Sequence, residues 1–316
     1  MPVTAYDKVG SGGDPGGPAF INGRKYVILV YGSGDTMHEA MYAEAMENGA
    51  AVCRLCPHHC MRKDGKLGLC GARMNHGGQF VSLNYGRVTS LGMDPVEKKP
   101  LRRFMPGTMT LSAGSFGCNL ACPYCQNHSI AHGSVESRYV PPQEMARLAA
   151  KQDVPSLSFT YNEPLVGYEW VYDAARMAKE AGIKVILVTN GYVERKPLAQ
   201  LLPYVDAMNI DLKAFTEETY RTVCRGSLEP VKRTIAEAAK TCHVEVTCLL
   251  VTGMHTEEEL TEMFDWLAGV DRELPLHLSR YFPRHRYEEP PTDLVWMERM
   301  GRIAGERLSY VYLGNV

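Results

Sequence analysis

Two patterns of apolar and polar residues divide the chain near residue 107. Beyond it, short apolar runs with the length of buried strands alternate with segments whose apolar residues recur as on one face of a helix. The runs predict strands at 108–115, 154–160, 184–189, 206–212, 244–251, 275–281 and 309–313. The segments between them predict helices at 141–152, 167–182, 229–240, 256–269 and 292–308. This alternation is typical of a parallel sheet covered by helices, either a (β/α) barrel or a doubly wound sheet.

Before residue 107 the pattern is weaker. MHEAMYAEAMENG at 37–49 has apolar residues at helical spacing and ends on glycine, so it predicts a helix. KYVILVYG at 25–32 predicts an edge strand, preceded by the flexible stretch GSGGDPGGP. Residues 50–106 contain a group of cysteines and few long apolar runs, which indicates a small metal-held module. The expected organisation is an extension at 1–36, a helix and cysteine-rich module at 37–106, and a sheet domain at 107–316.

Polar motifs follow the predicted strands. CNLACPYC comes after the first strand, TYNEP after the second and TNG after the third, while DLK closes the fourth. Catalytic groups at the carboxyl ends of the strands are what a (β/α) barrel predicts. The arrangement therefore favours a barrel-type enzyme, and an open doubly wound sheet stays compatible with it.

Charge and hydropathy limit the partners and the cellular compartment that we expect for the protein. The chain has 34 basic and 36 acidic residues among 316, so no excess positive charge indicates binding to nucleic acid or an anionic membrane. The short basic run Lys98, Lys99, Arg102 and Arg103 is expected to form a solvated face. No apolar run reaches the roughly 18 residues of a membrane span, and no signal peptide is recognisable. We expect a cytoplasmic protein without a membrane partner.

Seven of the ten cysteines fall into two tight groups, which in a reducing compartment favours metal or redox chemistry over disulfides. The first group is Cys53, Cys56, Cys60 and Cys70. Four thiols predict a closed metal site, and zinc and an iron–sulfur cluster are both compatible with it. His58 or His59 could replace one ligand. The three scattered cysteines are expected to be small buried hydrophobic residues: Cys224, Cys242 and Cys248.

The second group, Cys118, Cys122 and Cys125, lies within eight residues and is one ligand short of a closed site. An open coordination position lets a metal centre touch its substrate, as in a three-ligand catalytic zinc site. The alternative is a zinc knuckle completed by His128 or His132.

The CxxxCxxC spacing after a strand, with Tyr124 before the last cysteine, resembles the signature of the radical S-adenosylmethionine (radical SAM) superfamily. FGCNLACPYCQN, TYNEP, VTNGY, NIDLKAF and HLSRYFP occur in the order seen in proteins similar to the pyruvate formate-lyase activating enzyme. The resemblance is closest to the radical SAM enzymes of the AmmeMemoRadiSam system, which share CRLCPHHC…GLCGAR and DPVEKKPLRRFMPG. It implies a partial (β/α) barrel in which three thiolates hold a [4Fe–4S] cluster, whose fourth iron binds SAM.

The resemblance also implies roles in SAM binding. Tyr124 would lie against the adenine, Asn162 and Glu163 would accept the methionyl ammonium, and Thr189 and Asn190 would reach the ribose. Two of these assignments have plainer alternatives. Glu163 could serve only as a negative charge at the start of the following helix, and Asn190 could serve only in an Asn-Gly turn.

Asp211 and Lys213 alternate on the fourth strand and therefore face the same side. The resemblance implies that Lys213 reaches the SAM carboxylate and Asp211 orients it, whereas paired to each other they would form an internal ion pair. His277 is a candidate catalytic residue near the substrate, or a satisfied structural group.

The sequence departs from its relatives in two places. Val188 stands where activating enzymes tend to have an acidic residue that helps to hold a cation, so a cation site there is in doubt. Those relatives continue past YLGN into a cysteine-containing tail, whereas this sequence ends at Val316, so a truncated C-terminus is one expectation.

The activity implied is reductive cleavage of SAM to a 5′-deoxyadenosyl radical that removes a hydrogen atom from a substrate. The activase-like motifs point to a protein substrate that becomes a glycyl radical, and to an electron donor such as flavodoxin or ferredoxin. One alternative is radical SAM modification of a small molecule or RNA. The other is a non-catalytic metal-binding interaction module.

Overall fold

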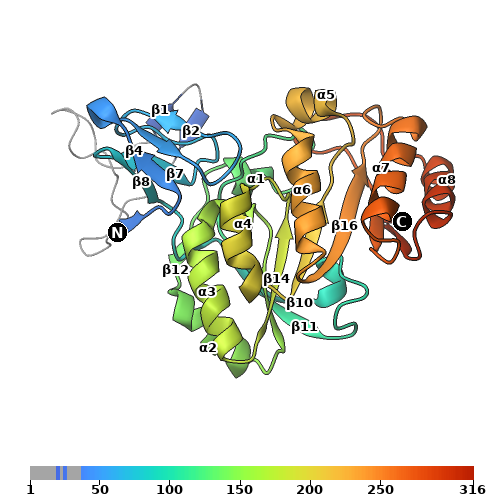
Figure 1. Cartoon of the computed structure of the whole chain (residues 1–316), viewed down its shortest axis with the longest axis horizontal. Helices are drawn as coiled ribbons and strands as arrows, with labels where there is room; N and C mark the ends of the chain where they lie inside the picture. The colour runs from blue at the N-terminus through green and yellow to red at the C-terminus, as the bar shows by residue number, and fades with distance from the viewer. Residues whose placement is uncertain (1–18, 22–23, 27–36) are drawn as a thin grey trace.

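The computed structural model describes residues 19–21, 24–26 and 37–316 (Figure 1). β1 (Ala19–Ile21) pairs antiparallel with β2 (Arg24–Tyr26). The strand predicted at 25–32 overlaps β2, and its remainder lies outside the described residues, as does most of the extension at 1–36. The rest of the chain forms a small, mainly β module and a larger domain built on one sheet, which lie side by side in Figure 1.

The large sheet confirms all seven predicted strands and adds an eighth before them. Its strands, in spatial order, are β10 (Ser90–Pro95), β11 (Met109–Gly114), β13 (Ser156–Phe159), β14 (Lys184–Thr189), β15 (Ala207–Asp211), β16 (His243–Leu250), β17 (Leu276–Arg280) and β18 (Val311–Gly314). β10 runs antiparallel to β11, and all later pairs are parallel. Because each strand lies beside its neighbour in sequence, no reversal of strand order occurs, and the doubly wound alternative is excluded. The fold is a partial (β/α) barrel.

Helices cover the outer face of this sheet, as right-handed crossovers require (Figure 1). The α-helices of the domain are α1 (His128–His132), α2 (Pro142–Lys151), α3 (Tyr168–Glu180), α4 (Arg195–Leu201), α5 (Glu217–Thr219), α6 (Leu228–Ala238), α7 (Glu257–Val270) and α8 (Leu294–Gly305). Short helical turns complete it: η2 (Val96–Lys98), η3 (Pro164–Gly167), η4 (Leu202–Tyr204) and the π-turn η5 (Tyr220–Cys224). All five predicted helices are present. No helix in the described part of the chain has the length and apolarity needed to cross a membrane.

The small module contains short antiparallel strands. They are β3 (His38–Glu39), β4 (Ala43–Ala45), β5 (Ala51–Cys53), β6 (Met61–Arg62), β7 (Arg73–His76) and β8 (Gln79–Ser82), with the turn η1 (Glu47–Gly49) between β4 and β5. β9 (Arg87–Val88) follows and pairs with β12 (Arg138–Tyr139).

The helix predicted at 37–49 is wrong. β3 pairs with β8 and β4 pairs with β5. Tyr42 and Asn48 have φ angles of 54° and 59°, which an α-helix cannot contain. Ladder hydrogen bonds from β3 to the distant β8 and from β4 to the adjacent β5 override local helix propensity, together with the Met41 N–H donated to the Glu169 carboxylate at 2.8 Å.

The basic run is not a solvated face throughout. Lys99 is 2% exposed, and its Nζ lies 2.7 Å from Asp94 Oδ2 and over the ring of Tyr161. The backbone N–H groups of Arg102 and Arg103 donate to the Glu245 carboxylate at 2.9 and 2.7 Å. Nearby apolar side chains pack together at the starts of the strands: Val96, Leu101, Ile186 and Ala207. Residues 96–106 therefore close the amino end of the barrel, opposite the polar motifs.

Candidate radical SAM site

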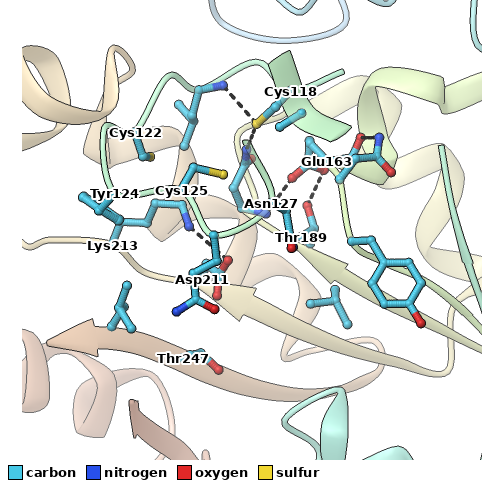
Figure 2. Close-up of a pocket in the computed structure, with 18 of the residues that line it drawn as sticks. Cys118, Cys122, Tyr124, Cys125, Asn127, Glu163, Thr189, Asp211, Lys213 and Thr247 are labelled. Carbon is cyan, nitrogen blue, oxygen red and sulfur yellow. Dashed lines mark hydrogen bonds and ion pairs between the residues drawn. The ribbon is translucent and has the colours of Figure 1, made fainter. Parts of the chain in front are cut away.

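A cavity of about 280 Å³ opens at the carboxyl ends of the strands (Figure 2). It is lined by the loop after β11, the loop after β13, and residues at the ends of the next strands. The predicted site residues that line it are Cys118, Cys122, Tyr124, Cys125, Asn162, Glu163, Thr189, Asn190, Asp211 and Lys213. The edge of the barrel that the sequence indicated therefore holds the pocket.

The three cysteines stand on one loop along one side of the pocket (Figure 2). All are free thiols. The backbone N–H of Leu120 donates to Cys118 Sγ at 3.4 Å, and Cys125 N–H donates to the Cys122 carbonyl at 3.2 Å. Gly117 has φ 95°, and a β-carbon there would lie 2.8 Å from the Cys70 carbonyl oxygen, so only glycine fits. This glycine fixes the start of the cysteine loop against the small module.

Glu163 is buried and faces the cysteines across the pocket (Figure 2). Its Oε1 accepts from Thr189 Oγ1 at 2.7 Å and from Leu165 N–H at 3.0 Å, and its Oε2 accepts from Asn190 N–H at 2.7 Å. The Leu165 contact caps the short turn η3, whereas α3, the helix of the alternative, begins after Gly167 without a side-chain cap. Burial raises the pKa of Glu163 to about 7 even though these three donors favour its ionised form.

Three residues with implied SAM contacts make protein contacts. Asn162 Oδ1 accepts from Ser115 N–H, and its Nδ2 donates to the Gly117 carbonyl. The Thr189 hydroxyl donates to Glu163. Asn190 Nδ2 donates to Asn119 Oδ1 at 2.9 Å and lies 3.6 Å from Cys118 Sγ. In this structure these side chains position the cysteine loop and Glu163.

Asp211 and Lys213 form an ion pair, with Nζ 3.0 Å from Oδ2 (Figure 2). Both also line the pocket, with side-chain exposures of 37% and 19%. Burial by itself lowers the pKa of Lys213, but Asp211 outweighs it and holds the pKa well above its usual range. The pair alternative is therefore confirmed, and the ammonium still faces the cavity.

Tyr124 is 4% exposed at the wall of the pocket. Its hydroxyl lies 3.5 Å from Cys224 Sγ, and its ring contacts the edge of Tyr287. Cys224 and Cys248 are fully buried, as predicted, while Cys242 is only partly buried. The contact of Cys224 with Tyr124 was missed, because nothing in the sequence connects positions a hundred residues apart.

His277 is not in the pocket, which corrects its assignment as a catalytic candidate. It lies near the amino end of β17, where its Nε2 is 2.5 Å from Glu245 Oε2 and its ring stacks on Tyr312. A residue near the start of a barrel strand lies at the amino end of the barrel, opposite the pocket. The structural alternative for His277 is therefore correct.

Val188 lines the cavity, so an apolar side chain stands there. Within the described residues, no three Cys, His, Asp or Glu side chains converge on a position for a single metal ion. His132 lines the cavity together with the three cysteines. His128 instead stacks on His285.

Residues 114–267 match the radical SAM superfamily. An uncharacterized protein of Methanocaldococcus jannaschii is 40% identical over 89% of this chain and 86% of its own length. The chain belongs to the radical SAM superfamily. Members of this superfamily are enzymes, which removes the non-catalytic interaction module from consideration.

Other relatives of this radical SAM enzyme differ in their named reactions. A second M. jannaschii protein, named as a glycyl-radical enzyme activating enzyme, is 24% identical over 64% of this chain and 87% of its own. The GTP 3′,8-cyclase of Limosilactobacillus fermentum is 30% identical over 45% of this chain and 46% of its own. Streptococcus suis SuiB bound to S-adenosylmethionine has a TM-score of 0.51 at 14% identity, over 63% of this chain and 48% of its own. The matched region spans about half of the cyclase and of SuiB.

The superfamily uses a [4Fe–4S] cluster and SAM, and the donor set of this pocket fits them. Three free thiols on one loop can supply three iron ligands and leave the fourth iron open. A carboxylate and an ammonium lie across the same cavity, where they match the opposite charges of an amino acid group.

Proposed function

We propose that this radical SAM enzyme is an activase that removes a hydrogen atom from a polypeptide substrate. Cys118, Cys122 and Cys125 hold the cluster. When bound, the cluster supplies the electron that cleaves SAM into methionine and the 5′-deoxyadenosyl radical. The observation that carries the proposal is the gathering of these thiols, Glu163 and Lys213 around one cavity.

The charged residues orient SAM in this proposal. Lys213 donates to the methionyl carboxylate while Asp211 fixes the direction of its ammonium. A carboxylate has about four acceptor sites and Glu163 uses three within the protein, which leaves one for the methionyl ammonium. Tyr124 presents its ring to the adenine. Thr189 and Asn190 hold Glu163 and the cysteine loop in place of the ribose contact inferred from sequence.

The position of the cavity supports a substrate that approaches from outside. The cavity opens at the carboxyl ends of the strands, where loops can admit an extended polypeptide. A polypeptide can insert one residue from outside, and glycine suits this because no side chain shields its Cα. The relative named as a glycyl-radical enzyme activating enzyme is named for a protein substrate that carries a glycyl radical.

A small-molecule substrate is the second candidate. The observation in its favour is the match to GTP 3′,8-cyclases over about half of the chain. A nucleotide would need a second cavity beside SAM, or loops that rearrange to form one.

Enzymes of this superfamily need an electron donor. We place the enzyme in the cytoplasm, where its ten free cysteines stay reduced and a flavodoxin or ferredoxin can serve as that donor.

Anaerobic reconstitution with SAM and candidate partner proteins tests the function. We expect slow formation of 5′-deoxyadenosine alone, faster formation with the right protein, and a carbon-centred radical on that protein by electron paramagnetic resonance. Deuterium from Cα-labelled glycine should enter 5′-deoxyadenosine. Stimulation only by a free metabolite or an RNA, with no label from protein, would move the enzyme to the second class of substrate.

The matched control is the triple variant Cys118→Ala, Cys122→Ala, Cys125→Ala. It should form no 5′-deoxyadenosine under the same conditions, because it lacks every ligand of the cluster. Product formation by this variant would refute the assignment of the three cysteines.

A further inference from the structure

The four cysteines of the small module lie together, although they come from three parts of it. Cys53 ends β5, Cys56 and Cys60 lie in the loop before β6, and Cys70 lies in the loop before β7. All four line one small internal cavity. A β-carbon added to Gly68 would lie 3.9 Å from Cys60 Sγ and 3.8 Å from Cys70 Sγ, so these two sulfurs both lie close to Gly68. None of the four is in a disulfide.

Backbone N–H groups donate to sulfurs of both cysteine groups. Leu69 N–H donates to Cys60 Sγ at 3.5 Å, and Leu120 N–H donates to Cys118 Sγ at 3.4 Å. N–H donors stabilise an anionic acceptor more strongly than a neutral one, so both contacts suit a metal-bound thiolate.

A buried cation lines the same cavity. Arg73 is 1% exposed, and its Nη1 lies 3.5 Å from Cys53 Sγ. Its Nε is buried and has no protein partner. Glu169 neutralises the guanidinium, but this N–H needs an acceptor, because a buried donor without one is destabilising. Thiolates and the sulfides of a cluster are acceptors of the kind that is lacking.

From these observations we propose that Cys53, Cys56, Cys60 and Cys70 hold a second iron–sulfur cluster. The three free thiols at Cys118 belong to a superfamily that uses a [4Fe–4S] cluster, and four free thiols have the same donor chemistry. A cluster also brings sulfides, which are further acceptors for the unpaired Arg73 Nε–H and which a zinc ion would not supply.

The second site is joined directly to the first. Cys118 N–H donates to the Cys70 carbonyl at 3.1 Å, so one hydrogen bond connects a ligand of each centre. His58 Nε2 adds a second connection, 2.6 Å from the carbonyl of Asn119. Two reduced clusters this close should interact magnetically.

The test uses full-length protein reconstituted anaerobically with iron and sulfide. The triple alanine variant at Cys118, Cys122 and Cys125 should keep about four irons and four sulfides, and wild type about eight of each, as two cubane clusters require. Reduced wild type should show electron paramagnetic resonance lines broadened by spin coupling, and the triple variant a simple signal. A triple variant with no metal would overturn the site, and one zinc in place of iron would overturn the cluster assignment.

The reciprocal variant Cys56→Ala, Cys60→Ala should lose about half of the iron and the spin coupling. Cys242→Ser is the matched control, because this partly buried cysteine belongs to neither group and should leave both unchanged. If the reciprocal variant does not fold, the iron content of wild type and the triple variant still decides the proposal. Four irons in wild type and none in the triple variant would refute it.

Discussion

Lys213 is both an internal ion-pair partner and a cavity residue. Its pairing with Asp211 holds its position and its charge, while 19% of its side chain stays exposed in the pocket. A charge held at a fixed point is what recognition of a carboxylate requires, since the side-chain entropy is lost before SAM arrives.

We predict that Lys213→Ala weakens SAM binding by roughly 10- to 150-fold, the equivalent of a lost charge-assisted hydrogen bond of about 1.5–3 kcal/mol. The iron–sulfur absorption should persist, because Lys213 is not a ligand. Equilibrium binding of SAM to reconstituted protein measures the effect. Lys232→Ala is the control, as Lys232 has a similar exposure of 21% and a carboxylate partner in Glu229 but lies outside the pocket. Equal affinity in both variants would restrict Lys213 to its ion pair.

The segment 96–106 and the first halves of β16 and β17 form the floor of the barrel. Glu245 is fully buried there and accepts from His243, His277 and the backbone of Arg102 and Arg103. Burial opposes its charge, but these donors outweigh burial and lower the pKa of Glu245 from 4.5 to about 2. The carboxylate thus holds a loop to two strands.

This floor predicts an acid-dependent loss of stability. The folded pKa of Glu245 lies below its unfolded value, so its contribution is complete above pH 4.5 and disappears as the pH falls towards 2. The shift corresponds to about 3 kcal/mol. Glu245→Gln should therefore lower the free energy of unfolding at pH 7 by roughly that amount, and the difference from wild type should shrink below pH 4.5.

Urea unfolding followed by tryptophan fluorescence between pH 3 and 7 measures this dependence. Glu258→Gln on α7 is the control, because that side chain is exposed and should leave the curve unchanged. A constant difference between Glu245→Gln and wild type across the whole range would contradict the assignment.

The small module and the barrel are joined by a buried ion pair. Arg73 on β7 and Glu169 on α3 are each 1% exposed, and Nη2 lies 2.6 Å from Oε1. The same carboxylate accepts Met41 N–H at 2.8 Å, and the same guanidinium donates to Cys53. One ion pair therefore connects the barrel helix, the first strands of the module and its cysteine group.

We predict that Glu169→Gln destabilises the protein by roughly 3–5 kcal/mol, because it leaves a buried guanidinium without its charge partner. The module should also become sensitive to proteolysis before the barrel does. Thermal unfolding and limited proteolysis measure the two effects. Glu44→Gln, which breaks the exposed pair with Arg54, should leave both unchanged. Equal melting temperatures for the two variants would show that the Arg73 pair does not hold the module to the barrel.

The sequence by itself determined a domain of alternating strands and helices and the edge of its sheet at which the site lies, while the observed strand order decided for a barrel. Buried parallel strands are continuous apolar runs and their covering helices are amphipathic, so both are readable locally. The cysteine spacings are also local, because the ligands of each loop are neighbours in sequence. The seven strands, five helices and the pocket-lining cysteines follow from such local signals.

Only the tertiary structure decided the remaining features. The segment 37–49 forms strands instead of the expected helix because β3 pairs with the distant β8 and β4 pairs with β5. Lys99 is buried because its ammonium pairs with Asp94. His277 lies at the amino end of the barrel because its ring pairs with Glu245 there. Thr189 and Asn190 bind the protein for the same reason. Lys99 and Asp94 are only five residues apart. His277, Thr189 and Asn190 are satisfied by partners far away in the chain, and the sequence carries no signal for those pairings.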